Sequence, residues 1–232
     1  MIDVRSFDSL GRFQNDWLNA RHHFSFSSYM DPKRMGWGAL RVWNDDEIAP
    51  QQGFQPHPHR DMEIITYVRQ GAITHEDSLG NKGRTEAGDV QVMSAGAGVV
   101  HSEFNLEDET TRIFQIWITP REAGGEASWA AMEFPKADRA GELVILATGR
   151  AGDETGLPIR QDARVLGATL KEGQSVSYAL EPGRHLYLAT SEGVVDVNGV
   201  KVDKRDGAAV KDVEEVVITA SEDAEIVLTD TP

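Results

Sequence analysis

Two pairs of residues carry the side chains in this sequence that are best suited to hold a metal ion. His57 and His59 are two residues apart, and so are His101 and Glu103. Side chains two apart on a β-strand point to the same face, so two neighbouring antiparallel strands with these pairs would bring three imidazoles and one carboxylate together. Such a ligand set suits Fe(II), and also Mn, Ni, Cu or Zn. Four protein ligands on an octahedral ion would leave positions open for a chelating molecule, O2 or water.

Glu63 is a second candidate for the carboxylate ligand. It follows His59 by four residues, roughly 13 Å along an extended strand, whereas Glu103 follows His101 by two residues, about 6.6 Å. Regular strand geometry therefore favours Glu103 as the fourth ligand and places Glu63 inside the domain or behind the ligands. A bend after His59 would bring Glu63 back as an alternative.

The elements that would position these side chains are short β-strands separated by glycine-rich turns. Frequent turn residues between short apolar runs are typical of an all-β barrel or sandwich. The clearest local signal is Asn198-Gly199, which lies between apolar runs at 194–197 and 200–202. Asn-Gly suits the positive φ angles of a type I′ turn, so we predict a hairpin there.

Helical pattern is scarce, and the chain divides in its middle. We expect one short helix within residues 8–20 and another at 126–133. The polar stretch from 121 to 140 reads as the connection between two β-domains. We therefore predict an N-terminal domain over residues 1–135, with the metal site, and a C-terminal domain over 136–232, without metal ligands.

The remaining histidines are given no ligand role. The second half of the chain echoes the first in its glycine-led strands, but its one histidine is His185, which reads as a surface residue. A duplicated domain that kept its fold and lost its site would have this pattern. His22 and His23 would face opposite sides of a strand, and His23 either lines a cavity or serves the structure. His75 precedes a turn and reads as a loop residue.

Composition limits the partners and the compartment. The 232 residues carry a net charge of -15, which argues against wide contact with phosphate backbones or anionic lipid. The chain has no cysteine, which excludes disulfides and thiolate metal sites and is compatible with the cytosol. No apolar run approaches the roughly 20 residues that cross a bilayer, and no signal peptide is visible. We expect a cytoplasmic protein with no direct nucleic-acid partner and no membrane.

The sequence resembles the pirin family of the cupin superfamily, and is most similar to bacterial pirin-like proteins with quercetinase activity. The resemblance covers nearly the full chain. It is densest in the following segments: His23-Phe24-Ser25-Phe26, Leu40-Arg41-Val42 with Asn44-Asp45-Asp46, Gly53-Phe54 with Pro56-His57-Pro58-His59-Arg60-Asp61-Met62-Glu63, His75 to Asn81, Met93 to Glu103, and Gln115 with Trp117.

The resemblance implies an all-β bicupin fold, with two β-barrels of the double-stranded β-helix type and few short helices. It implies metal in the N-terminal barrel only, with His57, His59, His101 and Glu103 as its ligands. Iron, as Fe(II), is the metal that it implies first; Zn, Mn, Ni, Cu and Co are alternatives.

The activity that the resemblance implies is that of a quercetin 2,3-dioxygenase, which cleaves flavonols with O2. A flavonol carries a 3-hydroxyl beside a 4-carbonyl, a good chelating group, and Glu103 would serve both as ligand and as base. Two alternatives stay open. The natural substrate could be another enol or catechol, or the protein could be a non-catalytic, metal- and redox-sensing pirin that acts in regulation through a protein partner.

Overall fold

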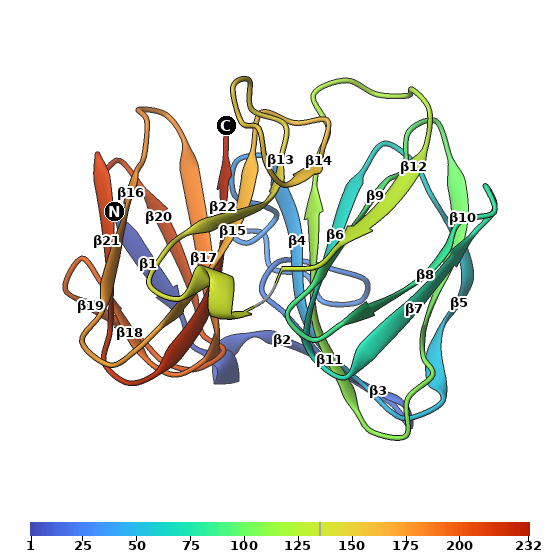
Figure 1. Ribbon diagram of the computed structural model, residues 1–232, viewed down its shortest axis with the longest axis horizontal. Helices are drawn as coiled ribbons and strands as arrows, with labels where there is room; N and C mark the ends of the chain where they lie inside the picture. Colours follow the sequence, from blue (N-terminus) through green and yellow to red (C-terminus); the bar gives the residue numbers. More distant parts are fainter. Residues whose placement is uncertain (135) are drawn as a thin grey trace.

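The structure of the protein is a computed structural model that describes residues 1–134 and 136–232. Regular structure in these residues is nearly all β, in two domains side by side (Figure 1). The two helices described are short 3-10 turns, η1 (Phe7–Ser9) and η2 (Lys136–Arg139). No helix in the described part of the chain is long and apolar enough to cross a membrane. The prediction of an all-β fold with few short helices is confirmed.

Two sheets form the first domain. The larger has the strand order β12-β9-β6-β11-β4-β3-β2 and the smaller has the order β5-β10-β7-β8. The bounds are β2 (Gly11–Gln14), β3 (Leu18–His22), β4 (Leu40–Ile48), β5 (Gln52–His59), β6 (Glu63–Gln70), β7 (Ala72–Asp77), β8 (Lys82–Glu86), β9 (Val90–Ser94), β10 (Val99–Asn105), β11 (Thr111–Ile118) and β12 (Ser128–Met132).

The second domain repeats this plan. Its larger sheet has the order β1-β20-β17-β22-β15-β13-β14, and its smaller sheet β16-β21-β18-β19. The interior is filled with aliphatic side chains such as Leu188 and Ile218. The bounds are β1 (Ile2–Arg5), β13 (Val144–Thr148), β14 (Leu157–Pro158), β15 (Arg164–Leu170), β16 (Ser175–Ala179), β17 (His185–Glu192), β18 (Val195–Val197), β19 (Val200–Val202), β20 (Gly207–Lys211), β21 (Glu215–Ala220) and β22 (Ala224–Thr231).

The two ends of the chain join the domains together. Strand β1, at the start of the chain, pairs with β20 in the sheet of the second domain. At the other end, the carbonyl of Pro232 accepts a hydrogen bond of 3.2 Å from the amide of Ala39 in the first domain. Trp37 adds a third link, because its indole N–H donates to the carbonyl of Leu186 at 3.0 Å. The division of the chain near residue 135 stays a proposal. Strand β1 precedes this boundary in the sequence but belongs to the sheet of the second domain.

Successive side chains of β4 point to opposite faces, so one face of this strand contacts the second domain and the other faces the interior of the first. The ring of Trp43 lies 5.5 Å from the ring of Tyr187 in the second domain. Asp45, two residues on, accepts hydrogen bonds from Nε and Nη2 of Arg205 at 2.7 and 2.9 Å and also contacts Arg69. Burial alone would raise the pKa of Asp45, but the two guanidinium groups outweigh it and hold the pKa below its usual range. The alternate side chains of β4 face the interior of the first domain.

Both predicted helices are wrong. Within residues 8–20, η1 ends at Ser9, and the chain continues as β2 and β3, which pair antiparallel. Asn15 makes the turn between them, because its side-chain oxygen accepts the amides of Trp17 and Leu18. Residues 128–132 form β12, which pairs with the edge of β9. In both places strand pairing satisfies more backbone groups than an isolated helical turn would, so tertiary contacts override a weak local pattern.

The predicted hairpin is confirmed. Strands β18 and β19 pair antiparallel around Asn198 and Gly199. Asn198 has a φ of 48° and Gly199 a φ of 85°, the left-handed conformations that a type I′ turn needs at both central positions.

Candidate metal centre

Three histidines converge on neighbouring strands of the small sheet in the first domain. Strand β5 pairs antiparallel with β10, and His57 lies directly opposite His101. The ring centroids are 4.5 Å apart for His57 and His101, 4.8 Å for His57 and His59, and 5.0 Å for His59 and His101. One ring nitrogen from each lies within 4.8 Å of those from the other two. The three imidazoles of the predicted ligand set therefore lie together, whereas Glu103 is not part of this group.

A bulge in β5 sets this register. His101 pairs with His57, but Glu103 pairs with Phe54, so two residues of β5 stand opposite a single residue of β10. One of these two residues is Pro56, which has no N–H to give to a ladder and therefore suits a bulge. Bulges bend a strand and redirect its side chains, and they are common beside active sites.

Hydrogen bonds determine which ring nitrogens are free. Nδ1 of His57 lies 2.7 Å from the carbonyl of Gln55. A carbonyl oxygen only accepts, so Nδ1 carries the proton and Nε2 keeps its lone pair. Nε2 of His101 is buried and has no hydrogen-bond partner. An orphaned buried nitrogen at the meeting point of three imidazoles fits a position reserved for a metal ion.

A chain of hydrogen bonds stands behind His101. Nδ1 of His101 lies 3.4 Å from Nδ1 of His75, and Nε2 of His75 lies 3.1 Å from a carboxylate oxygen of Asp77. Burial alone would raise the pKa of Asp77, but hydrogen bonds from Asn81 and His75 outweigh it and lower the pKa. The carboxylate of Asp77 therefore accepts a hydrogen bond from Nε2–H of His75, and Nδ1 of His75 accepts one from Nδ1–H of His101. This leaves Nε2 of His101 as the atom that faces the metal position.

His75 corrects one interpretation of the sequence. It lies on β7 and is fully buried, not in a loop. Glu103 lies opposite it, and Asp77 lies opposite His101. The available signal was the spacing of His75 and Asp77, which places both on one face of a strand just as the other two pairs are placed.

Glu103 sits at the centre of a polar network. Its Oε1 accepts hydrogen bonds from Thr66 at 3.0 Å and Gln91 at 2.7 Å, and its Oε2 accepts one from Gln115 at 2.7 Å. Its carboxylate lies within 4.8 Å of ring nitrogens of His75 and His101, a second group that shares His101 with the first. A carboxylate has about four lone-pair sites, so Oε2 keeps one for a further partner.

The donors to Glu103 come from one row of polar side chains that crosses the large sheet. Gln115 on β11 pairs with Thr66 on β6, and Thr66 pairs with Gln91 on β9. On its other side Gln115 pairs with Asn44, which in turn pairs with His22. Directly opposite residues share a face, so the whole row points into the first domain and fixes the carboxylate from the facing sheet.

Glu63 lies in neither of the two ligand groups found among the described residues. Its Oε2 accepts hydrogen bonds from Ser94 at 2.5 Å and from the backbone amide of Arg160 at 3.1 Å. Burial raises the pKa of Glu63 above its usual value. Since Arg160 belongs to the second domain, Glu63 joins the two domains.

The ring charges favour metal binding. Burial, followed by the neighbouring imidazoles, lowers the pKa of His59 to about 4 and that of His101 to about 3. Both rings are therefore neutral at physiological pH, which is the form in which histidine binds a metal.

A cavity of about 570 Å³ opens beside His57 and His59. This volume is within the range of roughly 300–1,000 Å³ usual for small-molecule sites. Its wall is partly aromatic, and the ring of Trp117 stands edge-on to His59 at 4.9 Å. The other aromatic and the polar side chains that line it include Trp17, Phe26, Phe54, His22, Asn44, Asp46 and Gln115.

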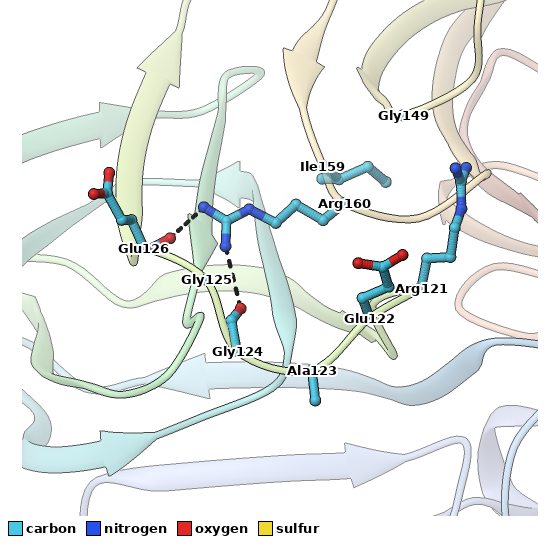
Figure 2. A pocket seen from close by; sticks show the side chains of 9 residues that line it. All are labelled: Arg121, Glu122, Ala123, Gly124, Gly125, Glu126, Gly149, Ile159 and Arg160. Carbon is cyan, nitrogen blue, oxygen red and sulfur yellow. Dashed lines mark hydrogen bonds between the residues drawn. The ribbon is translucent and has the colours of Figure 1, made fainter.

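Figure 2 shows a second hollow, which lies where the two domains meet. The side chain of Arg160 extends across it to the carbonyls of Gly124 and Glu126. No histidine lines this hollow. Arg160 is occupied by these backbone oxygens, and the hollow lies at the junction between the domains, apart from the metal centre.

Comparison with known proteins agrees with this geometry. The model of the Pirin family matches residues 3–118. The chain belongs to the pirin family. The model of the quercetinase C-terminal cupin domain matches residues 146–231 of this pirin, so the two-domain cupin fold is confirmed.

Relatives match along the whole chain. The "Pirin-like protein" of Caulobacter vibrioides is 64% identical over 99% of both chains. The "Quercetin 2,3-dioxygenase" of Escherichia coli strain K12 is 41% identical over 100% of this chain and 99% of its own. The crystal structure of the bacterial pirin YhhW from Escherichia coli in complex with nickel(II) superposes with a TM-score of 0.94 and 38% identity, covering 100% of this chain and 99% of that one.

The other histidines of this pirin have structural partners. His22 lines the cavity, and its Nδ1 lies 2.8 Å from the side-chain oxygen of Asn44. His23 is fully buried and contacts the hydroxyl of Tyr187 in the second domain at 2.8 Å, so its role is structural. His185, which was predicted to lie on the surface, is half-buried, and its ring stands edge-on to Trp37 at 5.2 Å.

Proposed function

We propose that this pirin is a metal-dependent dioxygenase that cleaves flavonols such as quercetin with O2. The observation that carries the proposal is the convergence of three imidazoles beside a partly aromatic cavity of about 570 Å³. The name of the Escherichia coli relative supports the same reaction. A cytoplasmic location and the lack of direct contact with nucleic acid or membrane belong to the proposal, supported by the absence of cysteine and the net charge of -15.

The proposed ligands are His57, His59, His101 and Glu103. The first three offer ring nitrogens within 4.8 Å of one another, and Glu103 offers the free lone pair of Oε2. This set of imidazoles and a carboxylate fits a divalent transition metal, with Fe(II) our first choice and Zn, Mn, Ni, Cu or Co as alternatives. The nickel(II) in the related structure supports a divalent ion without deciding which one acts here.

The residues of the chain have distinct parts in the reaction. A bound metal would supply a Lewis acid, which the 3-hydroxyl and 4-carbonyl of the flavonol could chelate and which would lower the pKa of the hydroxyl. Glu103 takes the hydroxyl proton as general base. Its three hydrogen bonds, from Thr66, Gln91 and Gln115, hold the carboxylate in place for this role.

The cavity wall would shape the rest of the chemistry. Trp17 and Phe54 pack edge-to-face at 5.2 Å and give the flat flavonol an apolar surface. Exclusion of water by these rings protects the reactive flavonolate from side reactions. O2 then forms a bond to each of the ring carbons that flank the 3-carbon, and the O–O bond and both carbon–carbon bonds to the 3-carbon break. The products are carbon monoxide and the opened ester, which takes back the proton from Glu103.

The proposal is tested with protein purified under nitrogen and loaded separately with each metal. Metal content is measured by elemental analysis, and quercetin and O2 are then added. We expect O2 consumption and carbon monoxide release in equal amounts with at least one metal. Full metal loading without either signal would overturn the dioxygenase assignment and favour the non-catalytic alternative.

Replacing His75 with alanine should weaken metal binding by about 10–100-fold, the usual loss for a hydrogen-bond partner of a ligand. His101 would lose the acceptor that fixes its Nδ1 proton and would no longer be held with Nε2 toward the metal. Competition with a coloured chelator for Ni(II) measures the affinity. His75→Gln, whose amide oxygen can accept the same bond, should recover part of it, and His185→Ala is the matched control. Wild-type affinity in His75→Ala would remove this residue from the site.

A further inference from the structure

Asp46 is a buried acid in the wall of the same cavity. It lies on β4 and is 2% exposed, and it faces the interior of the first domain together with Asn44. Its cross-strand neighbours are the apolar Ala20 on β3 and Ile113 on β11. The side chain therefore stands one row away from the polar network around Glu103, in apolar surroundings.

The oxygen Oδ1 of Asp46 has no hydrogen-bond partner. Of the described residues that line the cavity, Asp46 is the one whose buried side chain leaves a polar atom unsatisfied. Its polar neighbours are occupied: Asn44 bonds to His22, and Gln115 bonds to Glu103 and to Trp117. Burying a polar oxygen without a partner costs about 1–3 kcal/mol, so such an atom in a binding cavity indicates a partner that comes from outside.

The surroundings of Asp46 also favour its protonated form. Burial, and then the nearby charges of Asp45 and Glu103, raise its pKa well above the usual value, with only Arg69 acting against them. The surroundings therefore favour the protonated acid, which has one O–H to donate and one carbonyl oxygen to accept.

The raised pKa has a cost that argues for function. The unfolded chain ionises this residue above about pH 4, whereas the folded chain holds the proton to higher pH. The contribution of Asp46 to stability therefore falls as the pH rises from the unfolded pKa toward the folded one. A residue that weakens the fold and satisfies no internal partner fits a site that binds ligand.

We propose that Asp46 is a hydrogen-bonding subsite for an aromatic substrate and recognises a hydroxyl or carbonyl oxygen other than the two that chelate the metal. This assignment rests on the proposed function, because it takes the chelating end of the substrate to lie at His57 and His59. It predicts a preference for polyhydroxylated substrates over those with the chelating group alone.

Two ligands separate the chelating group from the remaining oxygens. Quercetin and 3-hydroxyflavone share the 3-hydroxyl and 4-carbonyl, but 3-hydroxyflavone has no further hydroxyl. Each is titrated under nitrogen into nickel-loaded wild type, Asp46→Asn, Asp46→Leu and Asp46→Ala, and the absorbance of the bound flavonol gives Kd. Elemental analysis confirms equal nickel, and thermal unfolding confirms folding, where we expect no loss because each variant removes a buried acid.

We expect Asp46→Leu and Asp46→Ala to weaken quercetin binding by about tenfold, as for a lost hydrogen bond in a buried site, and 3-hydroxyflavone binding by less than about twofold. Asp46→Asn keeps a donor and an acceptor and should stay within about threefold of wild type for both ligands. Equal losses for the two ligands, or no loss for quercetin, would overturn the subsite.

The outcomes distinguish this proposal from the proposed function. If wild type binds quercetin in the expected pattern but releases no carbon monoxide under O2, the reaction is wrong and the subsite stands. If turnover is normal but the two ligands respond alike to Asp46→Leu, the subsite is wrong and the reaction stands. Failure of metal-loaded wild type to bind either flavonol would overturn both.

Discussion

Replacing His59 with alanine should weaken metal binding by more than about 100-fold, beyond the range for partners outside the ligand set, and should abolish quercetin turnover. His59 supplies one of three nitrogens that lie within 4.8 Å of one another, and its ring is neutral at physiological pH. Two imidazoles and a carboxylate would remain, and the loss of one of the four proposed ligands should make the ion easier for a competing chelator to remove.

Thermal unfolding gives a readout of this loss that does not depend on activity. A metal that binds only the folded state stabilises it in proportion to the logarithm of its concentration over Kd. Added Ni(II) should therefore raise the Tm of the wild type and of the control His185→Ala, but not that of His59→Ala. An undiminished rise of Tm in His59→Ala would show that the ion sits elsewhere, for instance in the group formed by His75, His101 and Glu103.

Replacing Asp45 with asparagine should lower the free energy of unfolding by about 3–5 kcal/mol, the usual cost of removing one partner from a buried ion pair. Asp45 is fully buried between Arg69 and Arg205, and the side chain of Arg69 is 6% exposed. The variant would leave Arg69 buried with its charge uncompensated. Urea denaturation at neutral pH measures the effect.

Low pH should reduce the difference in the free energy of unfolding between wild type and Asp45→Asn. The pKa of Asp45 is held below its usual value, so its contribution is complete above the unfolded pKa of about 3.9 and is lost as the pH falls through the lower folded pKa. The matched control is Asp223→Asn, which removes the carboxylate from an exposed pair with Lys171 and should leave the urea midpoint unchanged. An equal shift in both variants, or none in Asp45→Asn, would contradict a buried pair that stabilises the fold.

Much of the architecture could be predicted from the sequence because the relevant signals are local. Asn198-Gly199 imposes a turn by backbone conformation alone, and the spacing of His57 and His59 places both side chains on one strand face. Residues 8–20 show where local signals fail. Their polar character is compatible with a capped helix, but pairing of β2 with β3 and of β3 with β4 decides the outcome.

The missing parts of the site come from register between distant strands. His75 reaches His101 only because β7 and β10 are neighbours, and Gln91, Thr66 and Gln115 form a row only because β9, β6 and β11 are aligned. None of these pairings follows from spacing within one segment. The burial of Asp46 could likewise not be predicted, because its sequence neighbours Asp45 and Glu47 are typical of a solvated acidic run, whereas β4 places its side chain in the interior.

Strand β1 constrains the order in which the protein can be made. Residues 2–5 leave the ribosome long before their hydrogen-bonding partner β20. Domains generally fold as they are synthesised, so the first barrel can fold while β1, which belongs to the sheet of the second barrel, is still unpaired. The second barrel then cannot complete its larger sheet without capturing that strand. Cutting the gene between the barrels should therefore yield a trailing half with a bare sheet edge, prone to pairing with other copies of itself.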